Sequence, residues 1–407
     1  MQLDTEFVRA QFPAFGEPSL RDQAFFENAG GSFACRQTVW RLTRFYKERK
    51  VQPFGPYAAS RLGGAEMDEA QERLARLLGV GTEEVSFGPS TTQNVYVLAQ
   101  AFSEYLVPGD VIVVTNQDHE ANTGAWRKLG ARGVEIREWR IDPETGHLDP
   151  GALTQLLDDR VKLVCFPHCS NVLGEINDVV GITRVIRRAG AVSCVDGVSY
   201  APHGLPNVDK LGADIYLFSA YKTYGPHQGI MVVRRALGED LPNQGHSFNS
   251  VWLSKRFTPA GPDHAQVAAC AGIADYVDAL YAHHFKAGRD AAGRAQSVHD
   301  LMRRHETRLL APLLDYLRCR NDVRLLGPSD PKLRAPTVAI DLGRPAASVA
   351  IELAAQGIMA GAGDFYAPRP LAAMGIKPSQ GVLRLSFVHY TTRAEVDRLI
   401  AALDRSL

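Results

Sequence analysis

The feature that most constrains the fold is a pair of short apolar runs that each lead to a charged residue. Residues 191–195 run directly into Asp196, and residues 214–218 are followed four positions later by Lys222. Both runs have the length and composition of buried strands, and the segment between them is long enough for a crossover. Parallel strands joined by a crossover end at the same edge of a sheet. We therefore expect Asp196 and Lys222 to face one crevice, at the edge where open α/β sheets bind their ligands.

Lys222 is an unusual residue to find after a buried strand. An ammonium group is costly to bury unless it is paired or used chemically, and a buried lysine with a shifted pKa suits Schiff-base chemistry. The alternative is a lysine whose stem follows the strand while its ammonium group reaches solvent. A Schiff-base lysine with an aspartate partner for the pyridinium nitrogen is the protein equipment of pyridoxal 5'-phosphate chemistry, and Asp196 is placed to be that aspartate.

Four motifs in order along the chain carry a resemblance to a known family. They are Asp118-His119-Glu120-Ala121-Asn122, Asp196-Gly197, Ser219-Ala220-Tyr221-Lys222 and Val382-Leu383-Arg384-Leu385-Ser386. Together they resemble the class V aminotransferase superfamily of fold-type I pyridoxal-phosphate enzymes, and within it the cysteine-desulfurase-like branch. The resemblance extends from about Phe25 to the C-terminus.

The expected fold class is α/β with two domains, because 407 residues are too many for one small core. We expect a large domain like that of the pyridoxal-phosphate-dependent transferases, with a mixed, mostly parallel seven-stranded sheet, and a smaller α+β C-terminal domain. The large domain is predicted over residues 21–264 and the small domain over residues 265–407. Residues 1–20 are predicted to be an N-terminal segment that packs with the small domain.

The predicted cofactor site begins with Ser-Thr-Thr at residues 90–92, which open a helix after a Gly-Pro turn. Free N–H groups, hydroxyl groups and the helix dipole converge there, so we expect this segment and Ser219 to hold the phosphate, with a plain helix cap as the alternative. The resemblance implies that His119 stacks on the cofactor ring, making His119, Asp196 and Lys222 the predicted catalytic residues. The full predicted cofactor set is Ser90, Thr91, Thr92, His119, Asn171, Asp196, Ser199, Ser219, Lys222 and Gly261.

Three members of this set lie outside the motifs described above. Asn171 follows the strand-like run 162–166 and is expected as a polar donor at the same sheet edge. Ser199 stands where desulfurases often carry a glutamine that bonds the phenolic oxygen of the cofactor, and it has a shorter reach. Gly261 stands where a family loop usually carries a threonine that contacts the phosphate of the partner subunit's site.

The predicted substrate-binding residues are Gly30, Tyr366, Arg369 and Arg384. Gly30 belongs to a paired-glycine loop that allows a close approach of the backbone to a ligand, and the resemblance implies that this loop borders the substrate. Arg384 would clamp the α-carboxylate through a bidentate pair. Arg369 and Tyr366 offer a cation and a phenol near the substrate side chain, so we expect that side chain to be polar or anionic.

The segment 357–370 separates this chain from true desulfurases. The resemblance implies that it should carry the cysteine that takes up sulfur, but it contains none, and Tyr366 lies near the expected position. Of the cysteines present, Cys35 is the one that follows a predicted site-facing loop. We therefore expect an enzyme that acts on an amino acid at Cα or Cβ through an external aldimine, with lyase-type removal of a side-chain substituent by C–S or C–C cleavage and no enzyme persulfide. Transamination and epimerisation stay open as alternatives, as does a non-catalytic binding module on the same fold.

Charge and composition bear on partners and location. The chain has 45 basic and 45 acidic residues, which argues against nucleic acid or an anionic membrane as the main partner. The sequence shows no signal region and no apolar run long enough to span a bilayer, and its scattered cysteines favour the reducing cytoplasm. Cys165, His168 and Cys169 fit no usual zinc spacing, so we predict no metal site. The resemblance implies a homodimer whose two sites are shared through loops 52–61 and 256–263.

Overall fold

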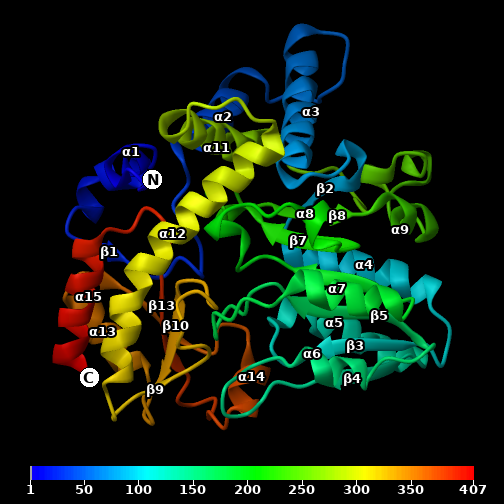
Figure 1. Ribbon diagram of the computed structural model, residues 1–407. Helices are drawn as coiled ribbons and strands as arrows, with labels where there is room; N and C mark the ends of the chain where they lie inside the picture. The colour runs from blue at the N-terminus through cyan, green and yellow to red at the C-terminus, as the bar shows by residue number, and fades with distance from the viewer. Residues whose placement is uncertain (1) are drawn as a thin grey trace.

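The computed structural model describes residues 2–407 and has a seven-stranded sheet at its centre (Figure 1). The strands are β2 (Val85–Gly88), β3 (Val111–Thr115), β4 (Glu135–Trp139), β5 (Val161–Pro167), β6 (Val192–Asp196), β7 (Ile215–Ser219) and β8 (Gly229–Val233). Their order in the sheet is β2-β8-β7-β6-β5-β3-β4, and β8 runs antiparallel to its two neighbours while the pairs from β7 to β4 are parallel. The predicted mixed, mostly parallel seven-stranded sheet is confirmed.

Helices cover both faces of this sheet. They are α3 (Ala58–Leu78), α4 (Thr91–Tyr105), α5 (Gly124–Arg127), α6 (Pro150–Thr154), α7 (Val179–Arg188), α8 (Val208–Leu211) and α9 (Arg235–Asp240). Ile112 and Val114 of β3 pack into a core with α4 and α5, whereas Val111 and Val113 pack into a core with α3 and α7. Successive side chains of a strand point to opposite faces, so a run of apolar residues buries both faces, as parallel sheets require.

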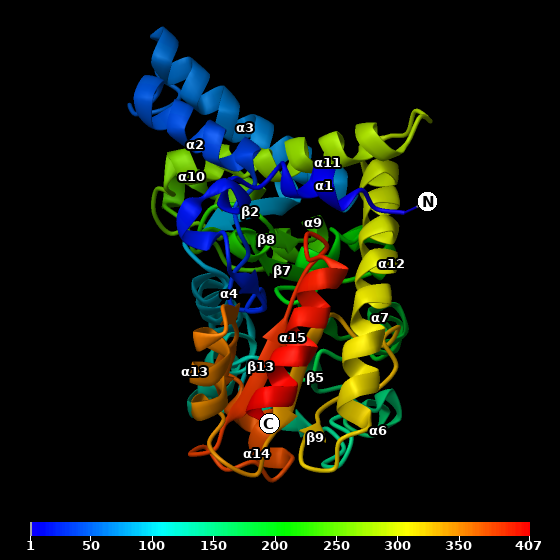
Figure 2. The same cartoon turned by 90° about the vertical axis from the view of Figure 1, so that its left-hand side faces the viewer.

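A second sheet, with the order β12-β13-β10-β9, lies beside the carboxyl ends of the large sheet's strands (Figure 1). Its strands are β9 (Arg324–Leu325), β10 (Thr337–Asp341), β12 (Gly361–Gly363) and β13 (Val382–Ser386), and its helices are α13 (Ala347–Ala355), α14 (Pro368–Ala373) and α15 (Arg393–Ser406). The long helix α12 (Ala291–Arg318) spans both units, because Val298 and Leu301 pack into the core of the large sheet while Leu310 and Leu314 pack into that of the small sheet (Figure 2).

A third group of helices projects from the molecule (Figures 1 and 2). It contains α2 (Arg36–Glu48), α3, α10 (His264–Ala269) and α11 (Ala271–His284), which pack on one another. The domain boundary predicted between residues 264 and 265 falls at the start of α10 and stays a prediction. The short helix α1 (Thr5–Arg9) contacts α15 through an ion pair of 2.9 Å between Arg9 and Glu395.

The segment 357–370, expected as a loop, contains two short strands. β11 (Ile358–Met359) pairs with β1 (Ala24–Phe25), and β12 pairs with β13 so that Gly361 lies opposite Arg384. These strands are too short for a periodic sequence signal, and pairing with distant partners creates them. None of the helices formed by residues 2–407 is long and apolar enough to cross a membrane.

Candidate active site

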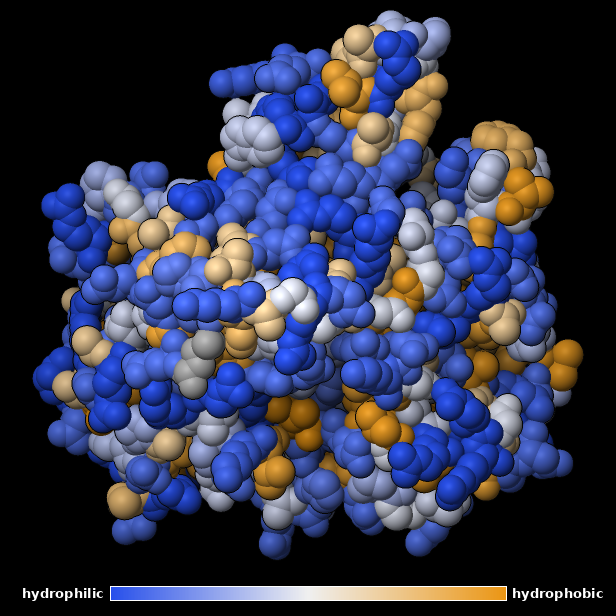
Figure 3. Space-filling view, turned by 45° about the horizontal axis from the view of Figure 1, so that its top comes forward, coloured by the Kyte–Doolittle hydropathy of each residue, from blue (hydrophilic) through white to orange (hydrophobic). Residues whose placement is uncertain are grey.

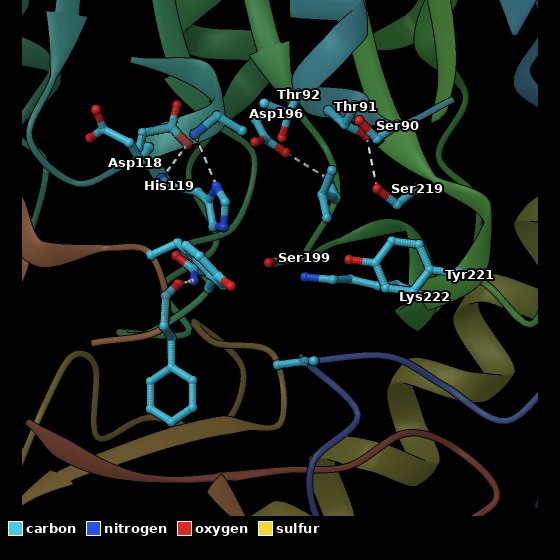
Figure 4. A pocket seen from close by; sticks show the side chains of 18 of the residues that line it. Ser90, Thr91, Thr92, Asp118, His119, Asp196, Ser199, Ser219, Tyr221 and Lys222 are labelled. Atoms are coloured by element: carbon cyan, nitrogen blue, oxygen red, sulfur yellow. Dashed lines mark hydrogen bonds between the residues drawn. The ribbon is translucent and has the colours of Figure 1, made fainter. Parts of the chain in front are cut away.

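A cavity of about 670 Å³ lies between the two sheets, at the carboxyl ends of β5, β6 and β7. It gathers residues from widely separated parts of the chain (Figure 4). Of the residues predicted from the sequence, those that line it are Gly30, Ser90, Thr91, Thr92, His119, Asn171, Asp196, Ser199, Ser219, Tyr366, Lys222 and Arg384. Arg369 and Gly261 are not among its lining residues.

Asp196 ends β6, and Lys222 follows the neighbouring strand β7 in a tight turn over residues 220–222. Both side chains are buried, with exposed fractions of 5% and 6%. Burial, together with the charge of Arg384, lowers the pKa of Lys222 to about 8, while the carboxylate of Asp196 opposes the shift. Burial also raises the pKa of Asp196 to about 6, against the Val198 N–H that donates to Oδ1 at 2.8 Å. Asp196 and Lys222 therefore line one cavity as predicted, and the pKa of the Lys222 amine lies well below that of an ordinary lysine.

His119 points into the same cavity as Lys222 (Figure 4). Burial lowers the pKa of its imidazole to about 3, with smaller contributions from the charges of Lys222 and Arg384. The backbone N–H of Ala121 donates to His119 Nδ1 at 3.0 Å, so the neutral ring carries its proton on Nε2. A neutral ring held at one nitrogen is suited to stack on a flat, electron-poor cofactor.

The amino end of α4 forms one end of the cavity, with Ser90, Thr91 and Thr92 around it (Figure 4). Ser90 caps the helix by accepting from the N–H of Gln93 at 3.2 Å, and the hydroxyl groups of Thr91 and Ser219 are 2.8 Å apart. Free N–H groups at a helix start and clustered hydroxyl groups suit a phosphate. The predicted helix cap and the predicted anion site therefore coincide.

Arg384 lines the cavity from β13 of the small sheet. Its guanidinium is buried, which lowers its pKa, and it donates from Nη2 to Glu27 Oε1 at 2.5 Å and from Nη1 to the carbonyl of Asn171 at 3.1 Å. The Phe365 ring covers its face at 3.7 Å. Glu27 and Phe365 both line the cavity, and neither was predicted from the sequence as a site residue. Glu27 stands three residues before Gly30, in the same motif from which only the glycine was predicted to contact the substrate.

The segment with Phe365 and Tyr366 lines the cavity and is held there by two hydrogen bonds. Both residues have left-handed backbone angles, with φ of 54° and 57°, which is unfavourable for side chains of this size. The Asn171 side-chain amide donates to the Phe365 carbonyl at 2.9 Å, and the Glu120 N–H donates to the Tyr366 carbonyl at 2.8 Å. Asn171, predicted as a cofactor contact, therefore also holds this segment, and the Tyr366 ring lies 5.6 Å from the ring of His119.

Arg369 contacts Glu120 instead of entering the cavity, with Nε 3.3 Å from Oε2. Arg369 is thus paired within its own chain, and its predicted contact with a polar or anionic substrate side chain stays a prediction. At Gly261 no heavy atom of residues 2–407, apart from its two neighbours in the chain, lies within 4 Å of the place a Cβ would take, and its predicted role in a partner's site stays a prediction.

The cysteine that lines the cavity is not Cys35, the one named in the sequence analysis. Cys35 is buried and does not line the cavity, and its thiol donates to the Gly272 carbonyl. Among residues 2–407 the thiol that does line the cavity is that of Cys169, which donates to the Gly174 carbonyl at 3.3 Å. Burial raises the pKa of Cys169 to about 12, so it stays a thiol at neutral pH. The described chain also shows no group of three or more histidine, cysteine or acidic side chains placed to hold a metal ion.

The donor set fits pyridoxal 5'-phosphate. A lysine amine, a buried carboxylate and a helix start lie around one cavity, matching the reactive aldehyde, ring nitrogen and phosphate of that molecule. Three buried polar atoms of the lining have no hydrogen-bond partner within residues 2–407, as expected of groups that await a ligand: Glu27 Oε2, Asn171 Oδ1 and Arg384 Nε. The fold and the cavity together define an enzyme that uses this cofactor.

Comparison with known proteins gives the family. The model of the family "Aminotransferase class-V" matches residues 24–399. The aminotransferase-like protein FGM3 of Gibberella zeae is 33% identical over 99% of this chain and 98% of its own length, and a cysteine desulfurase of Serratia proteamaculans is 31% identical over 100% and 98%. The chain belongs to the class-V aminotransferase family, whose members use pyridoxal phosphate.

Solved structures agree with this assignment. The cysteine desulfurase CsdA of Escherichia coli superposes with a TM-score of 0.81 at 25% identity, over 100% of this chain and 99% of that one. A cysteine desulfurase of Thermococcus onnurineus shares the fold, with a TM-score of 0.86 at 23% identity over 100% of this chain and 98% of that one.

Proposed function

We propose that this protein is a lyase that removes a side-chain substituent from an amino acid by cleavage of a C–S or C–C bond, without an enzyme persulfide. The observation that carries the proposal is the state of the thiols around the cavity. The segment with Phe365 lines the cavity and presents Tyr366, and the lining thiol of Cys169 is protonated and bound to a carbonyl. Sulfur capture requires a thiolate, so the leaving group must depart without being taken up by the protein.

The residues divide the work as follows. Lys222 would hold the cofactor, Asp196 would face its ring nitrogen, His119 would lie against its ring, and the residues at the start of α4 would bind its phosphate together with Ser219. When bound, pyridoxal phosphate supplies an electron sink for negative charge at the substrate Cα.

Arg384 would bind the substrate carboxylate, and the Lys222 amine would then remove the Cα proton. A base with a pKa of about 8 suits this step, because it lies closer to neutral pH than the pKa of an ordinary lysine and so leaves far more of the amine unprotonated. Tyr366, beside His119 and at the mouth of the cavity, would donate a proton to the departing group. A hydroxyl donor supports loss of a substituent over simple transamination, which needs no second proton donor there.

Incubation with a panel of amino acids in deuterated water tests the proposal. We expect exchange of the Cα proton and release of a side-chain fragment. Mass spectrometry of the small products measures both. The intact mass of the protein after incubation with cysteine should show no added sulfur. A persulfide that forms on any cysteine and is competent to transfer its sulfur would contradict the proposal, and formation of an oxo acid with an intact side chain would favour transamination.

We also propose that the protein works as a homodimer in a reducing compartment such as the cytoplasm. The projecting end of the molecule, where loop 52–61 enters α3, exposes Phe54, Tyr57 and Leu62 to 60%, 50% and 49%. Figure 3 shows hydrophobic surface at this end among polar side chains. A second copy of the chain would bury these residues and bring the loop toward the partner's cavity. All six cysteines are free thiols, which supports a reducing location.

A further inference from the structure

Arg384, to which we assign the substrate carboxylate, already holds a carboxylate of its own chain. Glu27 Oε1 accepts from Nη2 at 2.5 Å, and the side chains of Arg384 and Glu27 are exposed to 3% and 27%. Nη1 is bound by the carbonyl of Asn171, and Nε is buried without a partner in the described chain. Two of the three guanidinium nitrogens are thus in use before any ligand arrives.

The space around the Glu27 carboxylate is maintained by two glycines. A Cβ at Gly30 would lie 2.9 Å from Glu27 Oε1, and a Cβ at Gly361 would lie 2.5 Å from Oε2. Neither glycine has a left-handed backbone, so what distinguishes these positions is that a side chain at either would displace the Glu27 carboxylate from its present place. Gly361 lies opposite Arg384 in the β12–β13 pair, which places this cradle against the guanidinium.

The ion pair is incompletely satisfied. Glu27 Oε2 is buried without a hydrogen-bond partner within residues 2–407, and so is Arg384 Nε. A single contact between two charged groups, with one atom of each left unpaired, is weaker than a bidentate pair. A free carboxylate that engages both Nε and Nη2 would therefore be a better partner for Arg384 than Glu27 is.

We propose that Glu27 is a specificity-determining residue that competes with ligand carboxylates for Arg384. A ligand must displace Glu27 from Nη2 to form its bidentate pair, and the displaced carboxylate then faces the bound ligand inside the same cavity. The site thereby selects ligands whose carboxylate makes both contacts, and it disfavours a second negative charge near Glu27. This inference rests on the assignment of Arg384 in the proposed function.

Calorimetric titration with propionate, a monocarboxylate without an amine, measures the competition in the cofactor-loaded protein. Because Glu27→Gln keeps a hydrogen-bond acceptor but removes the charge, we expect propionate to bind about tenfold tighter, or about 1.4 kcal/mol. Glu120→Gln is the matched control, since Glu120 lines the same cavity but pairs with Arg369, and it should leave the affinity unchanged. Propionamide, which has no charge, should not distinguish Glu27→Gln from the unaltered protein.

Two further measurements keep the outcomes separate. Phenylglyoxal should modify Arg384 faster in Glu27→Gln, as mapped by peptide mass spectrometry, and Glu27→Asp should act in the same direction because its shorter side chain reaches Nη2 poorly. Equal propionate affinity with and without Glu27→Gln, combined with lost binding in Arg384→Lys, overturns the role of Glu27 alone. Unchanged binding in Arg384→Lys overturns the assignment of Arg384 as well.

Discussion

Asp196 and Lys222 follow adjacent parallel strands, and Asp196 lies directly opposite Leu217 in the register of β6 and β7. This register brings a carboxylate and an amine from two strand ends to one buried cavity. In that environment the amine has a pKa of about 8 and the carboxylate one of about 6. The two groups are therefore prepared for a cofactor that needs an amine to bind and a negative charge at its ring nitrogen.

The first prediction concerns covalent attachment of the cofactor. Borohydride reduction of the loaded protein followed by peptide mapping should place a pyridoxyl group on Lys222, because its amine is the buried amine of the cavity. Lys222→Ala should abolish the adduct, together with the visible absorbance of the cofactor joined to the lysine amine. Lys128 also lines the cavity but bonds to Tyr96, so Lys128→Ala is the matched control and should keep both signals. A pyridoxyl group on another lysine would refute the assignment.

The second prediction concerns the titration of Lys222 in the cofactor-free protein. Its pKa is lowered from 10.5 to about 8, so between these values the unfolded chain holds a proton that the folded chain has lost. The contribution of this group to stability therefore rises with pH across that window, by up to about 1.4 kcal/mol per pH unit. Below pH 8 the contribution is constant and unfavourable.

Labelling of Lys222 with an amine reagent should accordingly reach half its maximum near pH 8. Asp196→Asn should move this midpoint down, since the charge of Asp196 raises the pKa of the amine. A midpoint close to that of exposed lysines, or an upward shift in Asp196→Asn, would contradict the electrostatics of the site.

The third prediction concerns the Tyr366 hydroxyl. Tyr366→Phe should lower kcat by about a hundredfold if the phenol donates a proton to the leaving group, with little change in KM. Tyr96→Phe makes the same substitution at another residue that lines the cavity and should leave kcat nearly unchanged. Exchange of the Cα proton should survive in Tyr366→Phe, because Lys222 performs that step. If Tyr366→Phe loses both Cα-proton exchange and turnover, the phenol acts before the leaving group departs, which contradicts this prediction.

The fourth prediction concerns assembly. The double substitution Phe54→Asp and Leu62→Glu places charges on the exposed apolar end of the molecule and should convert a dimer into monomers with reduced activity. Ile351→Asp is the control, because Ile351 is 71% exposed on α13, away from this surface. Light scattering measures the mass of each variant. A fully active monomer of the unaltered protein would refute the shared-site dimer.

Apolar patterning along the chain predicts the strands of the large sheet and the position of Asp196 and Lys222 at its edge. Continuous apolar runs such as residues 111–115 bury both faces of a strand, and a charge placed directly after such a run has to lie at the sheet edge. Asp196 and Lys222 follow from such runs, residues 90–92 follow from a predicted helix start, and His119 follows from the family resemblance. All of them line one cavity.

The contacts among the residues at the substrate end of the site follow from tertiary packing. Glu27 meets Arg384 across 357 positions of sequence, the Asn171 side chain reaches Phe365, and Arg369 turns to Glu120. No local period encodes such contacts, because they form only when the small sheet docks on the large one. Burial, which sets the pKa of each group and leaves Cys169 a protonated thiol, is likewise a property of the assembled cavity and not of any segment of the chain.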